Sequence, residues 1–566
     1  MCGEHPEYGQ AAGAVDTGAA LVASCAGDGG SEGQGTTAQQ EQPSTPPSGG
    51  SGGDESTQGD ARGLDQQGVS AGHPLAAEAG TRMLDQGGNA VDAAIAAAFA
   101  VSVVEPYASG IGGGGSALIA DRDGQTEAVD YREVVAQDGQ IPASNTGIPG
   151  FVAGMAELHE QRGTLEWAEL LAPAVEMAEG GVPVTETFVQ RRDAGGAAAT
   201  SGLAQFAPGG VPVQVGDEIV QDDLAATFRT LQDQGPESFY TGELAGLLSS
   251  EVDGIDEASL DAYSVQHNEP PQGTVGDYEI VSSAAALPGV ALIRMMQNLD
   301  NGGISEVDPN SVEHIRRVSE EWAGAEQIAQ TELGDTDFVD VDYDAILGNG
   351  SGSGNADGEE EPLAMGDAPA SDSENMDKPG NTTHITVVDG DGTVVSMTNT
   401  LTEFWGSGQE VGGFFLNDQL SRFSTVTSPN NHPEPGRRSV TWSNPTMVLD
   451  GEGRPVLGLG TPGGANILSI LGNTLSRWAL QGQSLEDAVA APRFRLDSAS
   501  GSLLVEQALL DDPVADQLPE LGWPTQTAAE GLFGSVNALE IDWEQGTVSG
   551  PTDYRLEAGV VVSDAE

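Results

Sequence analysis

Two threonines and a histidine, Thr382-Thr383-His384, open a β-rich segment that directly follows a long stretch rich in Gly, Ser, Asp and Glu. A threonine hydroxyl is a poor nucleophile unless a base lies beside it. One solution is to make the threonine the first residue of a chain, because its own α-amine then accepts the proton. The abrupt start of the segment therefore predicts that the chain is cut before Thr382 and that Thr382 becomes a nucleophile.

The segment itself is predicted to be a β-hairpin. Its two β-rich runs, 383–388 and 393–398, are joined by an Asp-Gly-Asp-Gly sequence whose residues suit a tight turn. A turn centred on the middle of that sequence places Thr382 opposite Asn399, with Thr400 as the next residue. Cross-strand neighbours lie roughly 5 Å apart. We therefore expect the hydroxyls of Thr382 and Thr400 to lie close together.

A buried helix and a glycine-rich run stand far upstream. Residues 90–104 are apolar on nearly every face, and Asn89 is placed as their N-cap. The glycine-rich run 110–115 precedes an apolar strand, 116–120. Such a run could cradle phosphate, but no Lys-Ser or Lys-Thr follows it and the surrounding charge is negative. Close backbone packing is the favoured interpretation.

Strand and helix signals alternate along the body of the chain, and no internal repeat is found. Expected strands include 127–131, 278–282 and 384–388, and expected helices include 150–162, 165–179 and 311–329. This alternation predicts an α+β body with an α/β/β/α layering.

The charge balance limits the possible partners. The chain has 20 Lys and Arg residues against 88 Asp and Glu, a net charge of −68. Such a surface repels phosphate backbones, so we expect no nucleic-acid partner. Acidic residues spread along the whole chain favour a halophilic source, since salt screens their mutual repulsion. An acidic protein that works at low salt is the alternative.

The two cysteines, Cys2 and Cys25, both lie near the start of the chain. The body of the protein is therefore predicted to form no internal disulfide and to use no thiol in catalysis or metal binding. No cluster of His, Cys or carboxylate residues has metal-ligand spacing. We therefore expect no metal and no cofactor, and we assign structural roles to His73 and His384.

The sequence around Cys25, Val-Ala-Ser-Cys, is similar to a bacterial lipobox, and residues 26–64 have a linker-like composition. An exported protein with a lipid on Cys25, in the periplasm or at the cell surface, would have this arrangement. Against it, Arg62 is the first basic residue and Asp16 interrupts the apolar segment. The alternatives are a misassigned start or a chance match, so residues 1–64 are interpreted as a possible export segment followed by a linker.

Several separated motifs identify a family. They are "HPLAAEAGTRMLDQGGNAVDAAIAAAFAVSVVEPYASGIGGGG", "DYREV", "GIPGFVAGMAELHEQRG", "LGDTDFVDV", "TTHITVVDGDG" and "GTPGG". In this order they resemble the γ-glutamyltranspeptidases, N-terminal-nucleophile hydrolases made as one precursor that cuts itself into large and small subunits. The resemblance runs from about His73 to the C-terminus and implies a four-layer αββα sandwich that both subunits form together.

The resemblance implies that Thr382 attacks the carbonyl of Asn381, forms an ester and is released by hydrolysis. The large subunit would then be 65–381, with a mobile acidic tail at 348–380, and the small catalytic subunit 382–566. In the mature enzyme, Thr382 would attack the γ-carbonyl of a small γ-glutamyl compound and pass the acyl group to water or to an amine.

Other site residues are also implied by the resemblance. Thr400 matches the residue that orients the nucleophile, and Arg132 matches the arginine that pairs with the substrate α-carboxylate. The amides of Gly463 and Gly464 match the oxyanion hole, and they stand between an apolar run and a helix start, where N–H groups are unpaired. Gln419 is expected to contact the substrate.

The chain departs from the family where the substrate head group binds. In the family run similar to "LLNNQMDDF", an Asp just before the Phe holds the substrate α-ammonium; here that position is Arg422. Thr441 and Trp442 replace the serine pair of "PLSSM", and Thr402 replaces an asparagine. Three carboxylates are candidates to replace the missing one: Glu403, Glu410 and Asp418.

Three hypotheses about function stay open at this point. The first is a γ-glutamyltransferase or glutathione hydrolase with altered substrate contacts. The second is a related acylase that cleaves a glutaryl-type or polyglutamate amide. The third is a surface-tethered binding protein that kept the fold and lost the chemistry.

Overall fold

The computed structural model describes residues 63–196, 198–348, 381–529 and 531–565. The expected lipid site at Cys25 and nearly all of the two expected linker segments, 1–64 and 348–380, lie outside these residues. Leu64 belongs to the folded body rather than to the linker, because it is buried and its N–H donates to the carbonyl of Gly390 at 2.7 Å.

A seven-stranded antiparallel sheet forms the first of two stacked sheets. Its strand order is β20-β1-β9-β10-β2-β3-β6. In that order the strands are Gly559–Asp564, Gln66–Ala71, Thr382–Val388, Val394–Thr400, Gly114–Ala120, Thr126–Asp130 and Gln266–Asn268. The predicted hairpin, β9 and β10, therefore lies at the centre of this sheet.

The second sheet has six strands in the order β19-β18-β14-β13-β8-β7. These strands are Thr547–Ser549, Asn537–Asp542, Pro455–Gly460, Thr446–Leu449, Tyr278–Ser282 and Gln272–Val275. The part of the chain that the structure describes also has three small sheets: β4 (Val182–Pro183) with β5 (Glu218–Ile219), β11 (Glu410–Val411) with β12 (Phe414–Phe415), and β15 (Phe494–Asp497) with β16 (Ser502–Val505) and β17 (Thr525–Thr527).

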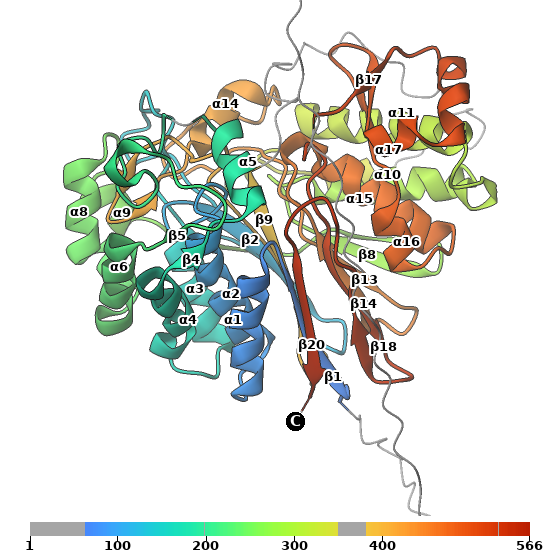
Figure 1. Ribbon diagram of the computed structural model, residues 1–566. Helices are drawn as coiled ribbons and strands as arrows, with labels where there is room; N and C mark the ends of the chain where they lie inside the picture. Colours follow the sequence, from blue (N-terminus) through green and yellow to red (C-terminus); the bar gives the residue numbers. More distant parts are fainter. Residues whose placement is uncertain (1–62, 197, 349–380, 530, 566) are drawn as a thin grey trace, which may run out of the picture. The chain divides into compact units, whose positions relative to one another are not determined.

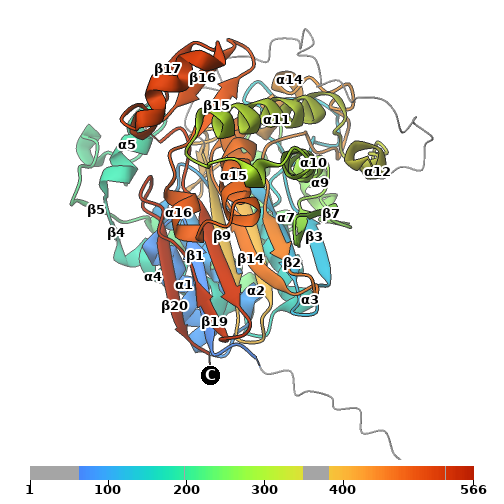
Figure 2. The same cartoon turned by 90° about the vertical axis from the view of Figure 1, so that its right-hand side faces the viewer.

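Helices cover the outer faces of both sheets (Figures 1 and 2). Against the first sheet lie α1 (Pro74–Asp85), α2 (Ala90–Val104) and α3 (Phe151–Arg162), with α4 (Trp167–Gly180) and α6 (Asp222–Gln234) outside them. On the side of the second sheet lie α10 (Gly289–Asn301), α11 (Val312–Thr331), α15 (Ile467–Leu475) and α16 (Leu485–Ala490). The other α-helices of the described residues are α5 (Glu186–Ala194), α7 (Glu237–Tyr240), α8 (Glu243–Glu251), α9 (Glu257–Asp261), α12 (Tyr343–Leu347), α14 (Arg422–Thr425) and α17 (Gln507–Leu510). The predicted α/β/β/α layering is confirmed, and the expected strands and helices coincide with β3, β8, β9, α3, α4 and α11.

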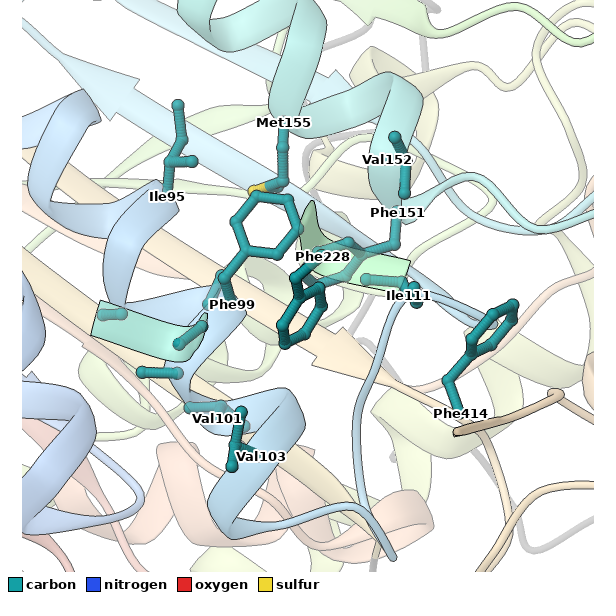
Figure 3. Packing of buried hydrophobic residues seen from close by; sticks show 14 of the residues in the cluster. Ile95, Phe99, Val101, Val103, Ile111, Phe151, Val152, Met155, Phe228 and Phe414 are labelled. Atoms are coloured by element: carbon teal, nitrogen blue, oxygen red, sulfur yellow. The ribbon is translucent and has the colours of Figure 1, made fainter. Parts of the chain in front are cut away.

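Helix α2 is the buried helix that the sequence predicts. All of its residues are buried, and Asn89 caps its first turn while Asp92 bonds back to the Asn89 N–H. Phe99 packs edge-on against Phe151 and Phe228 (Figure 3), with ring centroids 5.4 and 5.8 Å apart, and against Trp167 at 5.7 Å. Among the described helices, none has the length and apolar character needed to span a membrane.

The two sheets meet closely where β14 crosses β9. A Cβ on Gly458 would lie 2.9 Å from a side-chain carbon of Thr386, and a Cβ on Gly460 would lie 2.2 Å from His384 Cε1. Real Cβ atoms do not approach this closely, so these two positions must be glycine for the sheets to stack at this distance.

The register of the β9–β10 hairpin differs from the sequence prediction by one residue. Thr382 pairs with Thr400, and Asn399 pairs with Thr383. The cause is a longer connection, 389–393, in which Gly392 adopts a left-handed φ of 86° and the Asp389 N–H bonds to the carbonyl of Thr393. The shift moves Thr400 directly opposite Thr382.

The glycine-rich run packs against backbone, as the favoured interpretation predicts. Gly113 precedes β2, and a Cβ there would lie 2.3 Å from the carbonyl oxygen of Thr400. A Cβ on Gly112 would lie 2.1 Å from the carbonyl oxygen of Phe415. These glycines bring the start of β2 against the end of β10, next to Thr382.

Candidate active site

The Thr400 hydroxyl lies between the Thr382 hydroxyl and the Asn381 carbonyl, which are the two groups that would react in self-cleavage. The Thr382 hydroxyl donates to Thr400 Oγ1 at 3.4 Å, and the Thr400 hydroxyl donates to the Asn381 carbonyl oxygen at 3.2 Å. The Thr402 N–H also donates to Thr400 Oγ1, at 2.8 Å. All four residues are buried. The hydroxyl of Thr400 is therefore fixed between the expected nucleophile and the carbonyl that it would attack.

Thr402 is held in an unusual conformation beside this pair. Its φ is 82°, a left-handed value that is rare for a β-branched residue. Its carbonyl accepts from Asn381 Nδ2 at 3.2 Å, and its hydroxyl donates to the side-chain oxygen of Gln419. The structure thus brings together Asn381, Thr402 and Gln419, which sequence reasoning had named separately.

A chain of hydrogen bonds continues from Gln419 to Arg132. Gln419 Nε2 donates to Ser439 Oγ at 2.9 Å, and Arg132 Nη1 donates to the Ser439 carbonyl at 2.7 Å. Ser439 was not predicted from the sequence, although it stands only two residues before Thr441, which was. By contrast, Trp442 packs into the hydrophobic cluster around the second sheet, and Thr441 is buried beside it in the chain.

Arg132 is already oriented by an acidic neighbour. Its guanidinium is buried, with Nε 3.0 Å and Nη2 2.5 Å from the carboxylate of Asp130. Burial alone would raise the pKa of Asp130, but Arg132 and Arg438 lower it below its ordinary value. The guanidinium is therefore fixed in one orientation by a carboxylate that stays ionised.

Arg422 lies among carboxylates. Its Nη2 is 3.1 Å from Glu403 Oε1, and the Glu403 N–H donates to Asp418 Oδ1 at 2.9 Å. Burial, and then the charge of Glu403, raise the pKa of Asp418 to about 7, although Arg422 opposes the shift. Glu410 instead accepts from the Gly413 N–H at 2.7 Å and closes the β11–β12 hairpin. Three carboxylates were candidates to replace the family's missing Asp. The contacts above link Glu403 and Asp418 to Arg422, whereas the contact of Glu410 is with the β11–β12 hairpin.

Glu133 was missed by the sequence analysis although it follows Arg132 directly. It is fully buried, and among the described residues neither of its carboxylate oxygens has a hydrogen-bond partner. Burial raises its pKa to about 8, and the charge of Asp418 adds to the shift. A Cβ on Gly114, the residue paired with Thr400, would lie 3.0 Å from Glu133 Oε2. Glu133 therefore lies close to the end of β10.

Gly463 and Gly464 form the turn between β14 and α15. Their φ values are 153° and 55°, and within the part of the chain that the structure describes neither N–H donates a hydrogen bond. Gly458 and Gly460 face Thr386 and His384 on β9. Strand β14 therefore runs toward the Thr382 end of β9 until it ends at Gly460, and the two glycines follow after Thr461 and Pro462.

The two histidines have structural surroundings. His384 faces the second sheet, and its ring nitrogens lie 2.8 Å from Thr398 Oγ1 and 3.2 Å from Ser396 Oγ. Burial lowers its pKa to about 3, so the ring is neutral at ordinary pH. His73 accepts from the Leu75 N–H at the start of α1, and burial lowers its pKa to about 4. Among the described residues, no group of three or more His, Cys, Asp or Glu is arranged to hold a metal ion.

Comparisons with known proteins identify the family of the chain. The family model for gamma-glutamyltranspeptidase matches residues 76–563. The capsule biosynthesis protein CapD proenzyme of Bacillus anthracis is 33% identical over 499 residues, covering 86% of this chain and 89% of that protein. The glutathione hydrolase proenzyme of Bacillus subtilis strain 168 is 31% identical over 528 residues, covering 86% and 89%.

A solved structure supports the fold. The crystal structure of cephalosporin acylase from Bacillus halodurans aligns with a TM-score of 0.77 and 22% identity, covering 91% of this chain and 98% of that one. The architecture is thus the expected α+β, four-layer αββα sandwich. The chain belongs to the gamma-glutamyltranspeptidase family.

Proposed function

We propose that the chain is a self-cleaving γ-glutamyl acyltransferase or hydrolase whose nucleophile is Thr382. One observation carries the proposal: the hydroxyl of Thr400 bonds both to Thr382 Oγ1 and to the carbonyl oxygen of Asn381. Relatives named glutathione hydrolase proenzymes support the proposal that this chain is a precursor.

In the cleavage step, Thr382 Oγ attacks the carbonyl carbon of Asn381 while Thr400 polarises the carbonyl oxygen. The C–N bond breaks, the amine of Thr382 takes a proton, and an ester joins Asn381 to Thr382 Oγ. Water then hydrolyses the ester, which leaves a carboxylate on Asn381 and a free α-amine on Thr382. The products would be a large subunit ending at Asn381 and a small subunit, 382–566.

In turnover, the α-amine of Thr382 accepts the proton of its own hydroxyl as the oxygen attacks the substrate γ-carbonyl. The N–H groups of Gly463 and Gly464 would stabilise the oxyanion, and such a donor is worth on the order of 3 kcal/mol in the transition state. The substrate amine leaves with a proton, and water or an acceptor amine then releases the acyl group. Arg132 would pair with the substrate α-carboxylate, and Thr402 and Gln419 would line the same end of the site.

A denaturing gel with mass spectrometry tests the proposal. The wild-type protein is expected to give two pieces that break between Asn381 and Thr382, and Thr382→Ala is expected to stay whole because it has no nucleophile. The exposed Thr525 offers a matched control, so Thr525→Ala should be cut like the wild type. Wild-type protein that turns over substrate as one uncut chain would refute the mechanism.

A second candidate is a related acylase that acts on a glutaryl-type or polyglutamate amide. This candidate is favoured by Arg422, whose side chain is paired with Glu403. Arg422 stands at the position where the family run "LLNNQMDDF" has the Asp that holds the substrate α-ammonium. A cation there opposes the binding of an α-ammonium, whereas it tolerates an acyl chain that lacks one. Thr441 and Trp442, in place of the family's serine pair, would also change the contacts to the head group.

The two candidates are separated by comparing γ-glutamyl and glutaryl anilides as substrates. If the acylase reading holds, the free α-amine gives no advantage in the wild type, and Arg422→Asp raises the γ-glutamyl to glutaryl ratio of kcat/KM by about tenfold or more, since a hydrogen bond to a charged group is worth about 1.5–3 kcal/mol. The exposed Arg229→Asp is the charge-matched control and should leave the ratio unchanged. A wild type that strongly prefers the γ-glutamyl anilide would favour the first candidate.

The cellular setting completes the proposal. We assign the protein to an extracytoplasmic location, with the possible lipid on Cys25 as its anchor, and to a halophilic source. Its partners would be the small acyl substrate and the two subunits of one precursor. The acidic composition argues against nucleic acid as a partner.

A further inference from the structure

Strand β9 loses one of its two neighbours before it reaches Thr382. Strand β10 pairs with β9 along its whole length, from Val388 to Thr382. Strand β1 pairs with it only from Val388 to Ile385, where Ala71 is the last partner. The end of β9 that carries the proposed nucleophile is therefore held by backbone hydrogen bonds on one side only.

The carboxylate of Glu105 holds the side chain of Thr383 at this end of β9. Glu105 directly follows α2 and is buried. Its Oε2 accepts from the Thr383 hydroxyl at 2.9 Å, and its Oε1 accepts from the Tyr107 hydroxyl at 3.3 Å. Thr383 is itself buried. The residue next to Thr382 is thus tied by its side chain to the end of a rigid, buried helix.

The backbone at Gly72 closes over this hydrogen bond. A Cβ on Gly72 would lie 2.6 Å from Glu105 Oε2 and 2.7 Å from Thr383 Oγ1. No side chain fits there, so the chain leaving β1 lies directly against both oxygens. A hydrogen bond to a carboxylate in such a low-dielectric site is stronger than the same bond in water.

Charged groups on neighbouring elements face the carboxylate. Arg191 of α5 is buried, stacks on Phe404 with its guanidinium 5.6 Å from the ring centre, and attracts Glu105 electrostatically. Glu557 repels it. Burial raises the pKa of Glu105 above its ordinary value, and the Thr383 hydrogen bond and then Arg191 offset only part of this rise. The Glu105–Thr383 hydrogen bond therefore joins the end of α2 to the end of β9, and Arg191 of α5 attracts the carboxylate that makes it.

We propose that Glu105 is a positioning residue for the nucleophile, acting through the hydroxyl of Thr383; this inference rests on the proposed function. Successive side chains of a strand point to opposite faces. Fixing the Thr383 side chain on the helix side therefore fixes the direction of Thr382 on the other side. The need is greatest after cleavage, because Thr382 then has no preceding residue to hold it.

Thr383→Val tests the inference, because it keeps the shape of the side chain and removes the hydroxyl. We expect kcat for a γ-glutamyl anilide, counted per cleaved molecule, to fall about 10- to 100-fold, since small misplacements of a reacting group cost up to 10²-fold. KM should stay within about twofold, because no substrate contact is lost. Thr383→Ser, which restores the hydroxyl, should recover kcat.

Tyr107→Phe is the matched control, since it removes the bond to the other oxygen of the same carboxylate. It should lower the unfolding temperature and leave kcat nearly unchanged. Equal kcat losses in Tyr107→Phe and Thr383→Val, or none in Thr383→Val, would overturn the inference. If Thr383→Val yields no folded protein, Glu105→Asp, which withdraws the carboxylate by one methylene, must show the kcat loss instead. A wild type that neither cuts itself nor turns over the anilide would count against the proposed function rather than against the role of Glu105. The two failures are therefore distinguishable.

Discussion

Two buried acids, Glu133 and Asp418, share the surroundings of Arg132 and Arg422. Glu133 has a pKa of about 8 and Asp418 a pKa of about 7, in both cases chiefly because of burial. The charges of Asp130 and Asp418 also raise the pKa of Glu133, and the charge of Glu403 raises that of Asp418. A buried carboxyl without a partner is expensive to ionise. At neutral pH this part of the site therefore carries less negative charge than its composition suggests.

The pKa of Glu133 predicts a pH dependence of stability. The folded state keeps this proton up to about pH 8, whereas an unfolded chain releases it near a pKa of about 4.3. Between these values the unfolded state binds fewer protons, so the unfolding free energy falls as pH rises, by up to about 1.4 kcal/mol per pH unit. Glu133→Gln should flatten this part of the curve, as measured by urea denaturation from pH 5 to pH 8.

The exposed Glu251→Gln serves as the control for Glu133→Gln and should keep the wild-type curve. An unchanged slope in Glu133→Gln would mean that the carboxyl is ionised in the folded protein. In that case a hydrogen-bond partner or counter-charge must reach it.

The strand and helix elements were largely predictable from the sequence, and their contacts were not. The buried helix at 90–104 and the hairpin followed from periodicity and turn residues. The register was wrong by one residue because the left-handed Gly392 lengthens the connection, which composition alone does not reveal.

The candidate site was predicted only in part for a related reason. Local motifs named Thr382, Thr400 and Gln419, but Ser439 joins them through contacts between segments that are distant in the chain. Glu133 could have been suspected from its place in "DYREV". Its burial without a partner, however, depends on glycines at 114 and 147 that pack against it.

At the level of elements, the stacking of the two sheets predicts the effect of Gly460→Ala. The new methyl group would overlap the imidazole of His384, which three hydroxyls hold in place. Overpacking of this kind costs about 1–3 kcal/mol or more. We expect a lower unfolding temperature and slower self-cleavage, measured by thermal unfolding and by gel.

Gly451→Ala is the matched control for this substitution, because a Cβ there meets nothing within 4 Å. It should behave like the wild type. If Gly460→Ala were as stable as Gly451→Ala, the sheets would have to be further apart than the structure has them.

At the level of the whole molecule, the net charge of −68 predicts a dependence on salt. Raising the ionic strength from 0.1 M to 1 M shortens the Debye length from about 10 Å to about 3 Å, which screens repulsion between exposed carboxylates. We expect the unfolding temperature to rise steadily over this range in calorimetry. A temperature that stays constant, or falls, would favour an acidic protein adapted to low salt.

The strand order of the first sheet has a consequence for the two pieces that self-cleavage would create. Strand β1, which precedes the proposed cut, lies between β20 and β9, which both follow it. In the second sheet β8 pairs with β13, again across the cut. Both sheets thus contain strands from both fragments, and neither fragment can dissociate without breaking strand pairs in each sheet. Dissociation of the heterodimer and global denaturation should consequently be a single event, independent of dilution until the fold itself fails.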